Sequence, residues 1–227
     1  MENINTMMHR VEIEGRTHSH SSVDLRKLTT YESELGFDAP VARAKLPSKY
    51  GLFDIYSFKM GEREHIALVM GEVRGRKDVL VRLHSSCMTG DIFGSYRCDC
   101  GPQLERAFEK VAKAGRGIIL YMDQEGRGIG IYNKINAYRL QELGYDTVEA
   151  NLHLGFGVDT RDFSHASSIL HYLGPESIFL MTNNPEKSRT LSEHGIKVSK
   201  VVPLRIPPNR YDSKYLMTKK IKLKHSL

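Results

Sequence analysis

The sequence has few cysteines and no long apolar segment. Its 227 residues include only three cysteines, and this odd number argues against a framework of disulfide bonds. No run of about 18 apolar residues is present, so we predict neither a membrane-spanning helix nor a membrane partner. The start, Met-Glu-Asn-Ile-Asn-Thr, lacks the basic residues and apolar stretch of a secretion signal. Together these absences favour a cytoplasmic protein with reduced thiols.

The length and charge of the chain restrict its fold and its ligands. With 40% hydrophobic residues, it can bury a substantial core as one domain of mixed architecture or as two small packed domains. Lysine and arginine total 33 against 27 aspartates and glutamates, which gives a net charge of +6. This charge suits an anionic ligand such as a nucleotide or a nucleic acid.

The first half of the chain has the pattern of a β-rich structure. Residues 1–42 are polar and have no sustained hydrophobic period, so we expect an N-terminal extension that is disordered in part. After them, residues 52–58, 65–70 and 78–83 are apolar segments separated by turn residues, as expected of successive strands.

The second half alternates predicted helices with predicted strands. Apolar residues at helical spacing predict helices that begin near Pro102, around residues 131–144 and 163–173, and after Asn184. Short apolar strands are predicted at residues 117–122 and 177–181. The whole pattern predicts an α/β fold of the mixed α+β kind, with helices packed against a mixed, partly parallel sheet.

All three cysteines lie within fourteen residues, at Cys87, Cys98 and Cys100. Cys98 and Cys100 leave the same face of an extended chain, and the connection to Cys87 is long enough to fold back. Cys100 also precedes a predicted helix, whose positive N-terminal end favours the thiolate that binds metal. We therefore predict a metal site; the alternative is three thiols without a shared role.

Zinc is the metal that this set of ligands favours, because soft thiolates select it over magnesium and calcium. Structural zinc sites have four protein ligands, whereas three ligands leave one position for water or substrate. Water at that position has a lowered pKa and can attack an electrophilic carbon. His84 as a fourth ligand would instead give a closed structural site.

Polar residues surround the thiols in the sequence. The segment 82–86, Arg-Leu-His-Ser-Ser, directly precedes the first cysteine. The segment 124–130, Gln-Glu-Gly-Arg-Gly-Ile-Gly, resembles a phosphate-binding glycine loop but lacks the P-loop ending, and an ordinary strand-to-helix turn explains its glycines equally well. Glu125 can accept N–H groups from a guanine-like edge, and Arg127 can bind phosphate through two parallel bonds.

Two later segments add charged groups near predicted helix starts. Asp159 and Arg161 lie two positions apart, and Thr182 and Lys187 flank a helix N-terminus where anions bind. Each pair alone is more typical of a solvated cap or a surface ion pair. Together with the thiols, they indicate an anionic substrate.

Five blocks follow one another along the chain. They are His-Ser-Ser-Cys-Met-Thr-Gly-Asp at 84–91, Arg-Cys-Asp-Cys-Gly-Pro-Gln-Leu at 97–104, Gln-Glu-Gly-Arg at 124–127, Tyr-Asp-Thr-Val-Glu-Ala-Asn at 145–151 and Thr-Asn-Asn-Pro-Glu-Lys at 182–187. In these blocks, and over most of the chain, the sequence resembles the GTP cyclohydrolase II family. The resemblance implies a monofunctional chain with one catalytic domain at residues 43–227.

The resemblance implies an enzyme that opens riboflavin biosynthesis. Members of the family hydrolyse GTP with zinc and magnesium, release formate and diphosphate, and form 2,5-diamino-6-(5-phosphoribosylamino)pyrimidin-4(3H)-one. We therefore expect one zinc ion per chain, magnesium on the GTP phosphates, and a homodimer.

The family's site residues are assigned to this sequence motif by motif. Zinc would be held by Cys87, Cys98 and Cys100. GTP would contact Arg82, Leu83, His84, Ser85, Ser86, Gln103, Glu125, Gly126, Arg127, Thr147, Thr182 and Lys187. The implied catalytic residues are Tyr138 near the purine, Asp159 as proton acceptor and Arg161 as nucleophile toward the α-phosphate. Because a guanidinium stays protonated, a charge clamp is the alternative role for Arg161.

Two other functions compete with this interpretation. The first is a family member that stops at the formylated product or uses another nucleotide. The presence of Tyr138, Asp159 and Arg161 argues against it. The second is a zinc-stabilised nucleic-acid-binding module, suggested by the net charge. Its three thiols are one fewer than the usual structural set, and its basic residues are not grouped with aromatics, so we expect no nucleic-acid partner.

Overall fold

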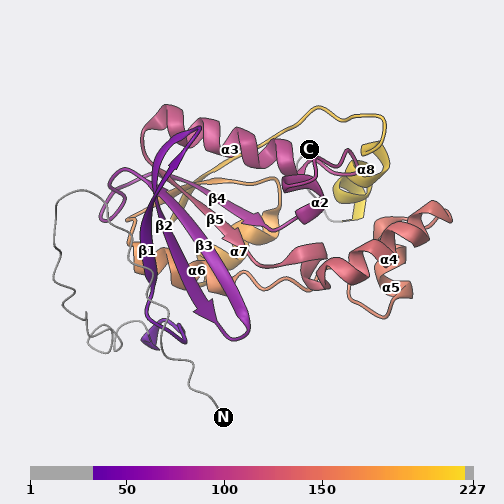
Figure 1. The fold of residues 1–227 in the computed structure, drawn as a ribbon, viewed down its shortest axis with the longest axis horizontal. Coiled ribbons are helices and arrows are strands. Elements are labelled where there is room, and N and C mark those ends of the chain that lie inside the picture. Colours follow the sequence, from indigo (N-terminus) through magenta and orange to yellow (C-terminus); the bar gives the residue numbers. More distant parts are fainter. Residues whose placement is uncertain (1–32, 223–227) are drawn as a thin grey trace, which may run out of the picture.

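A seven-stranded mixed sheet forms the centre of the computed structural model, which describes residues 33–222 (Figure 1). The strands are β1 (Ala42–Ser48), β2 (Gly51–Met60), β3 (Arg63–Met70), β4 (Val79–Ser85), β5 (Gly117–Met122), β6 (Ile178–Met181) and β7 (Val198–Val202). Their order across the sheet is β1-β2-β3-β5-β4-β6-β7. Strands β1, β2, β3 and β5 pair antiparallel, whereas β5, β4, β6 and β7 pair parallel.

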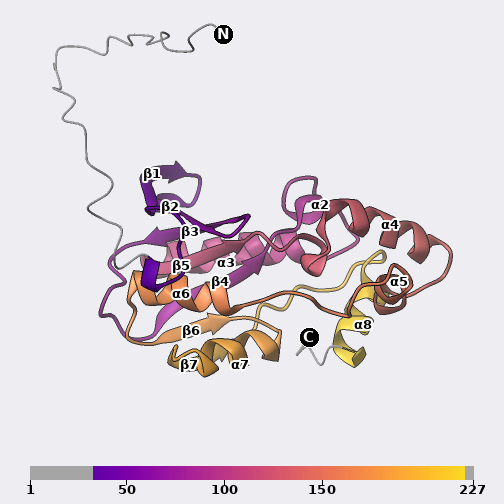
Figure 2. The same cartoon turned by 90° about the horizontal axis from the view of Figure 1, so that it is seen from below.

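Helices cover both faces of the sheet and extend beyond one end of it (Figures 1 and 2). They are α2 (Met88–Asp91), α3 (Cys100–Ala114), α4 (Gly130–Glu142), α5 (Thr147–His153), α6 (Ser164–Leu173), α7 (Pro185–Glu193) and α8 (Ser213–Lys222), with a 3₁₀ turn η2 (Glu125–Gly128). Helix α3 packs on one face, α6 and α7 pack on the other, and α4, α5 and α8 lie together past the end of the sheet (Figure 2). No helix between residues 33 and 222 has both the length and the apolar character needed to cross a bilayer.

The two faces of the parallel half have separate hydrophobic cores. Val81 and Leu83 of β4 pack with α6 and α7, while Ala107 and Val111 of α3 pack against Ile119 of β5. Strands covered on both faces are apolar along most of their length, and this is the pattern of β4 and β5. Because successive side chains of a strand point to opposite faces of the sheet, Arg82 and His84 of β4 lie on the face that α3 covers.

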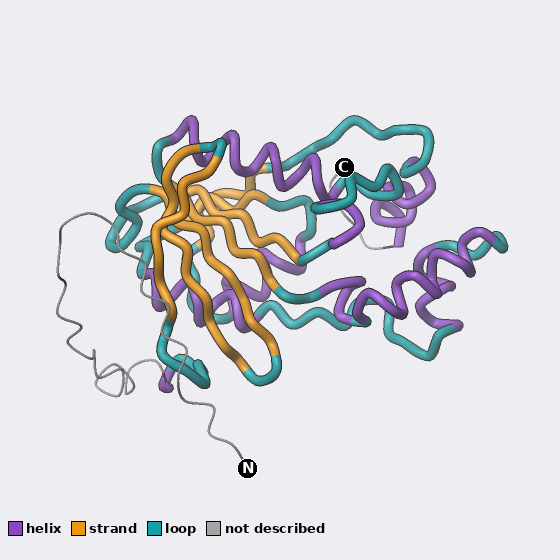
Figure 3. Tube along the Cα trace, in the orientation of Figure 1, coloured by secondary structure: helices purple, strands orange, loops and turns teal. Residues whose placement is uncertain are grey.

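The carboxyl ends of three neighbouring parallel strands meet at one edge of the sheet. Ser85 at the end of β4 is paired with Met122 of β5, and Arg82 is paired with Met181 of β6. The segments that follow these strands are residues 86–100 with the three cysteines (the metal loop), the η2 turn and the α7 helix (Figure 3). In sheets of this kind, ligands bind beyond the carboxyl ends of the strands.

The fold class predicted from the sequence is confirmed. The strands lie mainly in the first half of the chain, and the second half alternates helices with β5, β6 and β7 around a mixed sheet. Of the expected N-terminal extension, residues 1–32 lie outside the described residues. Phe37 belongs to the core, since it is 5% exposed and its ring centroid lies 5.1 Å from that of Phe58.

Candidate active site

The three thiols converge just beyond the end of β4. Cys87 directly precedes α2, Cys100 is the first residue of α3, and Cys98 lies in the loop between them. Their sulfur atoms all lie within 4.8 Å of one another, and those of Cys87 and Cys98 are 3.6 Å apart. Tetrahedral zinc with bonds of about 2.3 Å spaces its sulfur ligands by about 3.8 Å, so the thiol set fits zinc.

A glycine packs directly beneath these sulfur atoms. A Cβ atom added to Gly90 of α2 would lie 2.9 Å from Sγ of Cys98 and 3.2 Å from Sγ of Cys87. A Cβ atom added to Gly101 would collide with the backbone carbonyl of Gly90. The approach of α2 to α3 therefore requires both glycines, and this approach brings the three thiols together.

A buried carboxylate holds the metal loop in place. Oδ2 of Asp91 accepts hydrogen bonds from the backbone N–H of Cys87 (2.9 Å) and from the hydroxyl of Tyr121 (3.0 Å). Nε2 of His84 lies 3.0 Å from the same oxygen, and both side chains are at most 3% exposed. Asp91 thus ties the first thiol to β4 and β5.

The position of His84 decides between an open and a closed metal site. Its Nε2 contacts Asp91, and its Nδ1 lies 3.4 Å from Nη2 of Arg82, so both ring nitrogens are engaged away from the thiols. Burial lowers the pKa of His84 despite the hydrogen bond with Asp91, which makes the imidazole neutral near pH 7. Within the described residues, only the three cysteines form a potential metal cluster, as expected of an open site.

One of the three thiols is strongly favoured as a thiolate. Hydrogen bonds from Cys100 and Cys98, together with the nearby ammonium of Lys134, hold the pKa of Cys87 far below its ordinary value. Hydrogen bonding to Cys87 and Cys98, together with burial, raises the pKa of Cys100. A bound cation would stabilise the thiolate form of all three.

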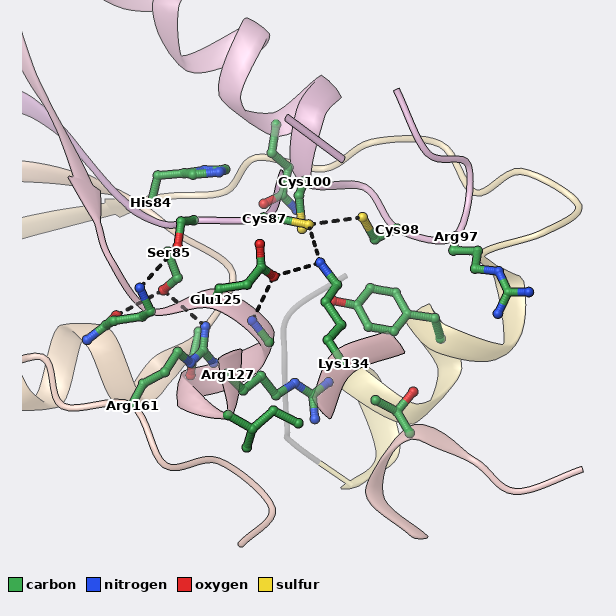
Figure 4. Close-up of a pocket in the computed structure, with 18 of the residues that line it drawn as sticks. His84, Ser85, Cys87, Arg97, Cys98, Cys100, Glu125, Arg127, Lys134 and Arg161 are labelled. Atoms are coloured by element: carbon green, nitrogen blue, oxygen red, sulfur yellow. Dashed lines mark hydrogen bonds and ion pairs between the residues drawn. The ribbon is translucent and has the colours of Figure 1, made fainter. Parts of the chain in front are cut away.

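The thiols form one wall of a pocket with an empty volume of about 1060 Å³ that opens to solvent (Figure 4). The sequence-predicted residues that line it are Arg82, His84, Ser85, Ser86, Cys87, Cys98, Cys100, Gln103, Glu125, Gly126, Arg127, Tyr138, Thr147, Arg161, Thr182 and Lys187. The structure thus brings these sixteen residues into one pocket, while their individual roles stay predictions.

Two sequence-predicted residues do not line the pocket. The side chain of Leu83 is fully buried in the core against α6 and α7, and only its carbonyl oxygen turns toward the site, where it accepts a 2.8 Å bond from Nζ of Lys187. Asp159 reaches the pocket only through its neighbour, because its carboxylate binds the guanidinium of Arg161.

Buried cations dominate the polar surface of the pocket. Arg82 donates to the carbonyl of Met181 (3.1 Å) and to Oε1 of Gln103 (2.8 Å). Its burial lowers its pKa to about 10, so it remains charged at neutral pH. Lys187 is 5% exposed at the N-terminal end of α7. These positive charges favour a ligand with several negative charges.

Arg127 combines an unusual backbone conformation with an unsatisfied side chain. Its φ of 63° is in the left-handed region, and Thr160 fixes its carbonyl through backbone N–H (3.2 Å) and hydroxyl (2.9 Å) bonds. Its two terminal nitrogens are buried and make no hydrogen bond to any described residue. A buried guanidinium without acceptors is costly, and an anionic ligand in the pocket would satisfy it.

Glu125 is held by the protein more tightly than its motif suggested. Its Oε2 accepts the backbone N–H of Met88 (2.6 Å), and its Oε1 accepts the ammonium of Lys134 and the backbone N–H of Gly126 (2.8 Å each). A carboxylate offers about four acceptor sites, so one remains for a ligand.

Tyr138 stands beside the thiols on α4. Its hydroxyl lies 3.2 Å from Oγ1 of Thr89 in the metal loop, and burial raises its pKa. The guanidinium of Arg97 covers the ring at 4.8 Å from its centroid. The phenol is therefore neutral and can donate or accept a hydrogen bond close to the thiol cluster.

Several pocket residues were not identified from the sequence. They are Arg97, Gln124, Ile129, Lys134, Ala137, Gln141, Asn151, Asn183, Asn184 and Tyr215. Five of them lie inside the blocks quoted above, but the chemistry of a block does not show which of its side chains face the ligand; they are Arg97, Gln124, Asn151, Asn183 and Asn184. Lys134 precedes Tyr138 by four residues, and this helical spacing was the one signal that placed it on the same face.

The sequence of this chain is similar to known enzymes. Residues 39–203 match the family model described as GTP cyclohydrolase II. The chain is 50% identical over 185 residues to GTP cyclohydrolase-2 of Picrophilus torridus, covering 81% of this chain and 96% of that protein. It is 52% identical over 186 residues to GTP cyclohydrolase-2 of Neisseria meningitidis serogroup A, and the match covers 82% of this chain and 94% of that protein. The riboflavin biosynthesis protein RibBA of Bacillus subtilis is 50% identical over 185 residues, which are 80% of this chain and 46% of that longer protein.

Proposed function

The chain belongs to the GTP cyclohydrolase II family and is an enzyme of this class, and we propose that it converts GTP, with zinc and magnesium, into formate, diphosphate and 2,5-diamino-6-(5-phosphoribosylamino)pyrimidin-4(3H)-one. This places the enzyme in riboflavin biosynthesis. The observation that carries the proposal is one pocket with two features: three converging thiols on its wall and the unsatisfied guanidinium of Arg127. We also propose residues 43–227 as the catalytic domain.

Cys87, Cys98 and Cys100 would hold one zinc ion per chain and leave a position for a further ligand. When bound, zinc supplies a Lewis acid and lowers the pKa of water that it binds toward neutrality. The protein's part is to place C8 of the purine next to the thiol cluster. Tyr138 is suited to this task, because its neutral hydroxyl lies beside Thr89 on the metal loop.

Three buried cations would bind the triphosphate. The terminal nitrogens of Arg127 have no acceptor among the described residues, and Arg82 and Lys187 line the same pocket. Magnesium bound to the phosphates would add further positive charge and balance the leaving diphosphate. Thr182, which follows β6, would add a hydroxyl beside Lys187.

Guanine selectivity would depend on Glu125. Its one remaining acceptor site can take an N–H from the N1 edge of guanine, where adenine presents an acceptor instead. A buried carboxylate facing a second acceptor rejects the wrong base strongly, because both groups lose hydrogen bonds to water. Ser85, Ser86 and Gln103 complete the polar lining on the β4 side.

Arg161 is better suited to a charge clamp than to a nucleophile. Its Nε and Nη2 donate to Asp159, and its Nη1 lies 3.3 Å from the hydroxyl of Ser85. Burial lowers the pKa of Arg161, but the hydrogen bonds and charge of Asp159 raise it by more. The pKa therefore lies above its ordinary value, and the guanidinium holds its proton. We therefore propose that Arg161 binds the α-phosphate and that Asp159 orients it and accepts a proton during hydrolysis.

Formate and diphosphate measured in one reaction test the proposal. Purified, zinc-replete full-length chain is incubated with GTP and magnesium, with ATP as the parallel substrate and Cys98→Ser as the metal-site control. We expect both products in equal amounts from GTP, neither from ATP, and no formate from the variant. Absence of both products in zinc-replete protein would contradict the proposal. Diphosphate without formate would instead support the alternative of a family member that stops at the formylated product.

We also propose an assembly and a location for the chain. We propose a homodimer, which light scattering of the purified chain tests directly. We propose the cytoplasm as its location, because GTP is available there and thiols stay reduced.

A further inference from the structure

Lys134 lies between the two halves of the site, which are the thiol cluster and the turn that carries Glu125 and Arg127. Its Nζ is 3.2 Å from Sγ of Cys87 and 2.8 Å from Oε1 of Glu125 (Figure 4). The side chains of Lys134 and Glu125 are each 12% exposed. None of the five sequence blocks contains Lys134, and no role was assigned to it from the sequence.

The geometry makes Lys134 a bridge between two hydrogen-bond acceptors, the sulfur atom of Cys87 and the carboxylate of Glu125. An ammonium carries three N–H donors and no acceptor, and here it faces the sulfur atom of Cys87 and the carboxylate of Glu125. The ring of Tyr138 lies on another side of the ammonium, and Nζ is 5.9 Å from the centroid of this ring. An ordinary surface lysine would leave its head in water, whereas this one is enclosed on several sides.

The bridge joins elements that the chain does not connect locally. Cys87 follows β4, Glu125 begins the η2 turn after β5, and Lys134 belongs to α4. Glu125 also accepts the backbone N–H of Met88, so the metal loop and the η2 turn meet twice. Arg127, two residues after Glu125 and in the same turn, would move with any shift of that carboxylate.

We propose that Lys134 is a positioning residue that couples the zinc site to the GTP site. The inference rests on the proposed function, since it assumes that zinc and GTP bind at these residues. A hydrogen bond from an ammonium to a metal thiolate stabilises the thiolate and fixes its direction, in the way that other outer partners fix metal ligands. The same ammonium fixes Glu125 and therefore the η2 turn that presents Arg127.

Zinc affinity and GTP kinetics of matched variants test the coupling. The full-length chain is compared with Lys134→Met, Lys134→Arg and Lys113→Met, a control in which an exposed lysine of α3 is changed. Zinc dissociation constants are measured by competition with a chromophoric chelator without nucleotide. Cobalt-substituted protein gives the sulfur-to-metal charge-transfer band, and formate release gives KM and kcat.

We expect Lys134→Met to weaken zinc binding by about 10- to 100-fold, the usual effect of losing an outer partner of a metal ligand. Its cobalt charge-transfer band should move to longer wavelength, because the sulfur loses a stabilising N–H bond. KM for GTP should rise as well. Lys134→Arg should recover part of each effect, and Lys113→Met should behave as the unchanged chain.

Unchanged zinc affinity and an unmoved cobalt band in Lys134→Met would overturn the inference, even if KM for GTP rose, because Lys134 would then act only on the nucleotide. If Lys134→Met does not fold, Lys134→Gln is measured against the same criteria. Zinc binding that depends on Lys134 in a chain without GTP turnover would support the role of Lys134 at the zinc site while contradicting both the coupling and the proposed function. A chain that binds no zinc would contradict both.

Discussion

The guanidinium of Arg161 and the carboxylate of Asp159 form a fork-to-fork pair at the edge of the pocket. Nε donates to Oδ1 over 2.8 Å, and Nη2 contacts Oδ2. Burial raises the pKa of Asp159, but the bonds from Arg161 outweigh this effect, so the pKa of the carboxyl lies below its ordinary value. The pair therefore stays ionised through the neutral range.

This pairing predicts the acid limb of the pH profile. Asp159 must be ionised to accept a proton, and its lowered pKa keeps it ionised as the pH falls. Arg161→Met removes the opposing charge, so burial alone acts and the acid limb of kcat/KM should move to higher pH. Loss of the clamp should also lower kcat on the plateau by about 100-fold or more.

Arg161→Lys is the matched control, because lysine keeps the positive charge but cannot make the two parallel bonds of a guanidinium. The acid limb of its kcat/KM profile should lie closer to that of the unchanged enzyme. A nucleophilic Arg161 would instead give a guanylyl adduct. Intact-protein mass spectrometry after a neutral quench, which preserves an N–P bond, should find none.

Gly90→Ala should disturb the metal site without touching a ligand. The added Cβ would lie 2.9 Å from Sγ of Cys98, closer than a carbon and a sulfur atom can approach without strain. The loop must then shift, and we expect zinc affinity to fall by about 10-fold or more. Gly94→Ala is the control, since nothing lies within 4 Å of its added Cβ, although its positive φ adds local strain. Equal zinc affinity in both variants would contradict the packing argument.

His65 predicts a pH dependence of stability. Its Nδ1 accepts the backbone N–H of Asp123 (3.1 Å), so its Nε2 carries the proton and donates to Nδ1 of His165 (2.9 Å). Burial, together with the neighbouring groups of His165 and Arg63, lowers the pKa of His65 to about 4, below that of an unfolded histidine.

The unfolded chain therefore binds this proton first. Stability from the neutral His65 is fully present above about pH 6.5 and is lost as the pH falls toward 4. Between about pH 6.5 and 5 we expect the free energy of unfolding to fall by roughly 1.5 kcal/mol from this group. His65→Asn keeps an acceptor near Asp123 without titrating, so chemical denaturation at several pH values should show a flatter dependence. An equally steep dependence would refute the assignment.

Arg127 predicts a separation of stability from binding. Its guanidinium should make charge-assisted bonds to phosphate worth about 1.5–3 kcal/mol each, so Arg127→Ala and Arg127→Gly should both raise KM for GTP by about 10-fold or more. The left-handed backbone is unfavourable for any side chain but acceptable for glycine. Arg127→Gly should therefore be the more stable of the two by about 1 kcal/mol, measured by chemical denaturation. Equal stability would mean that the turn imposes no strain.

The parts of the fold that the sequence predicted have strong local patterns. The apolar runs of β4, β5 and β6 are typical of buried parallel strands, and Asn184 with Pro185 marks the start of α7. By contrast, β1 was not predicted, because Ala-Arg-Ala-Lys-Leu-Pro-Ser has little β propensity and lies on the exposed edge of the sheet, where it is held by pairing with β2.

The site was predictable only as far as its chemistry is local. The thiols stand close together in the sequence, so their convergence could be inferred from spacing alone. The contact of Lys134 with Cys87 joins residues 47 positions apart and depends on the packing of α4. Likewise, no pattern shows that both oxygens of Glu125 are already bonded, or that Arg127 has a positive φ.

The two halves of the site also differ in how much of the chain must fold to form them. The thiol ligands span residues 87–100, so closing their loop carries a small entropy loss. The nucleotide pocket collects side chains from Arg82 to Tyr215 and exists only when β4, β5 and β6 are paired. In a graded denaturant series we therefore expect GTP binding to disappear before metal ligation, so that the nucleotide reports on the complete sheet and the metal on the local loop of residues 87–100.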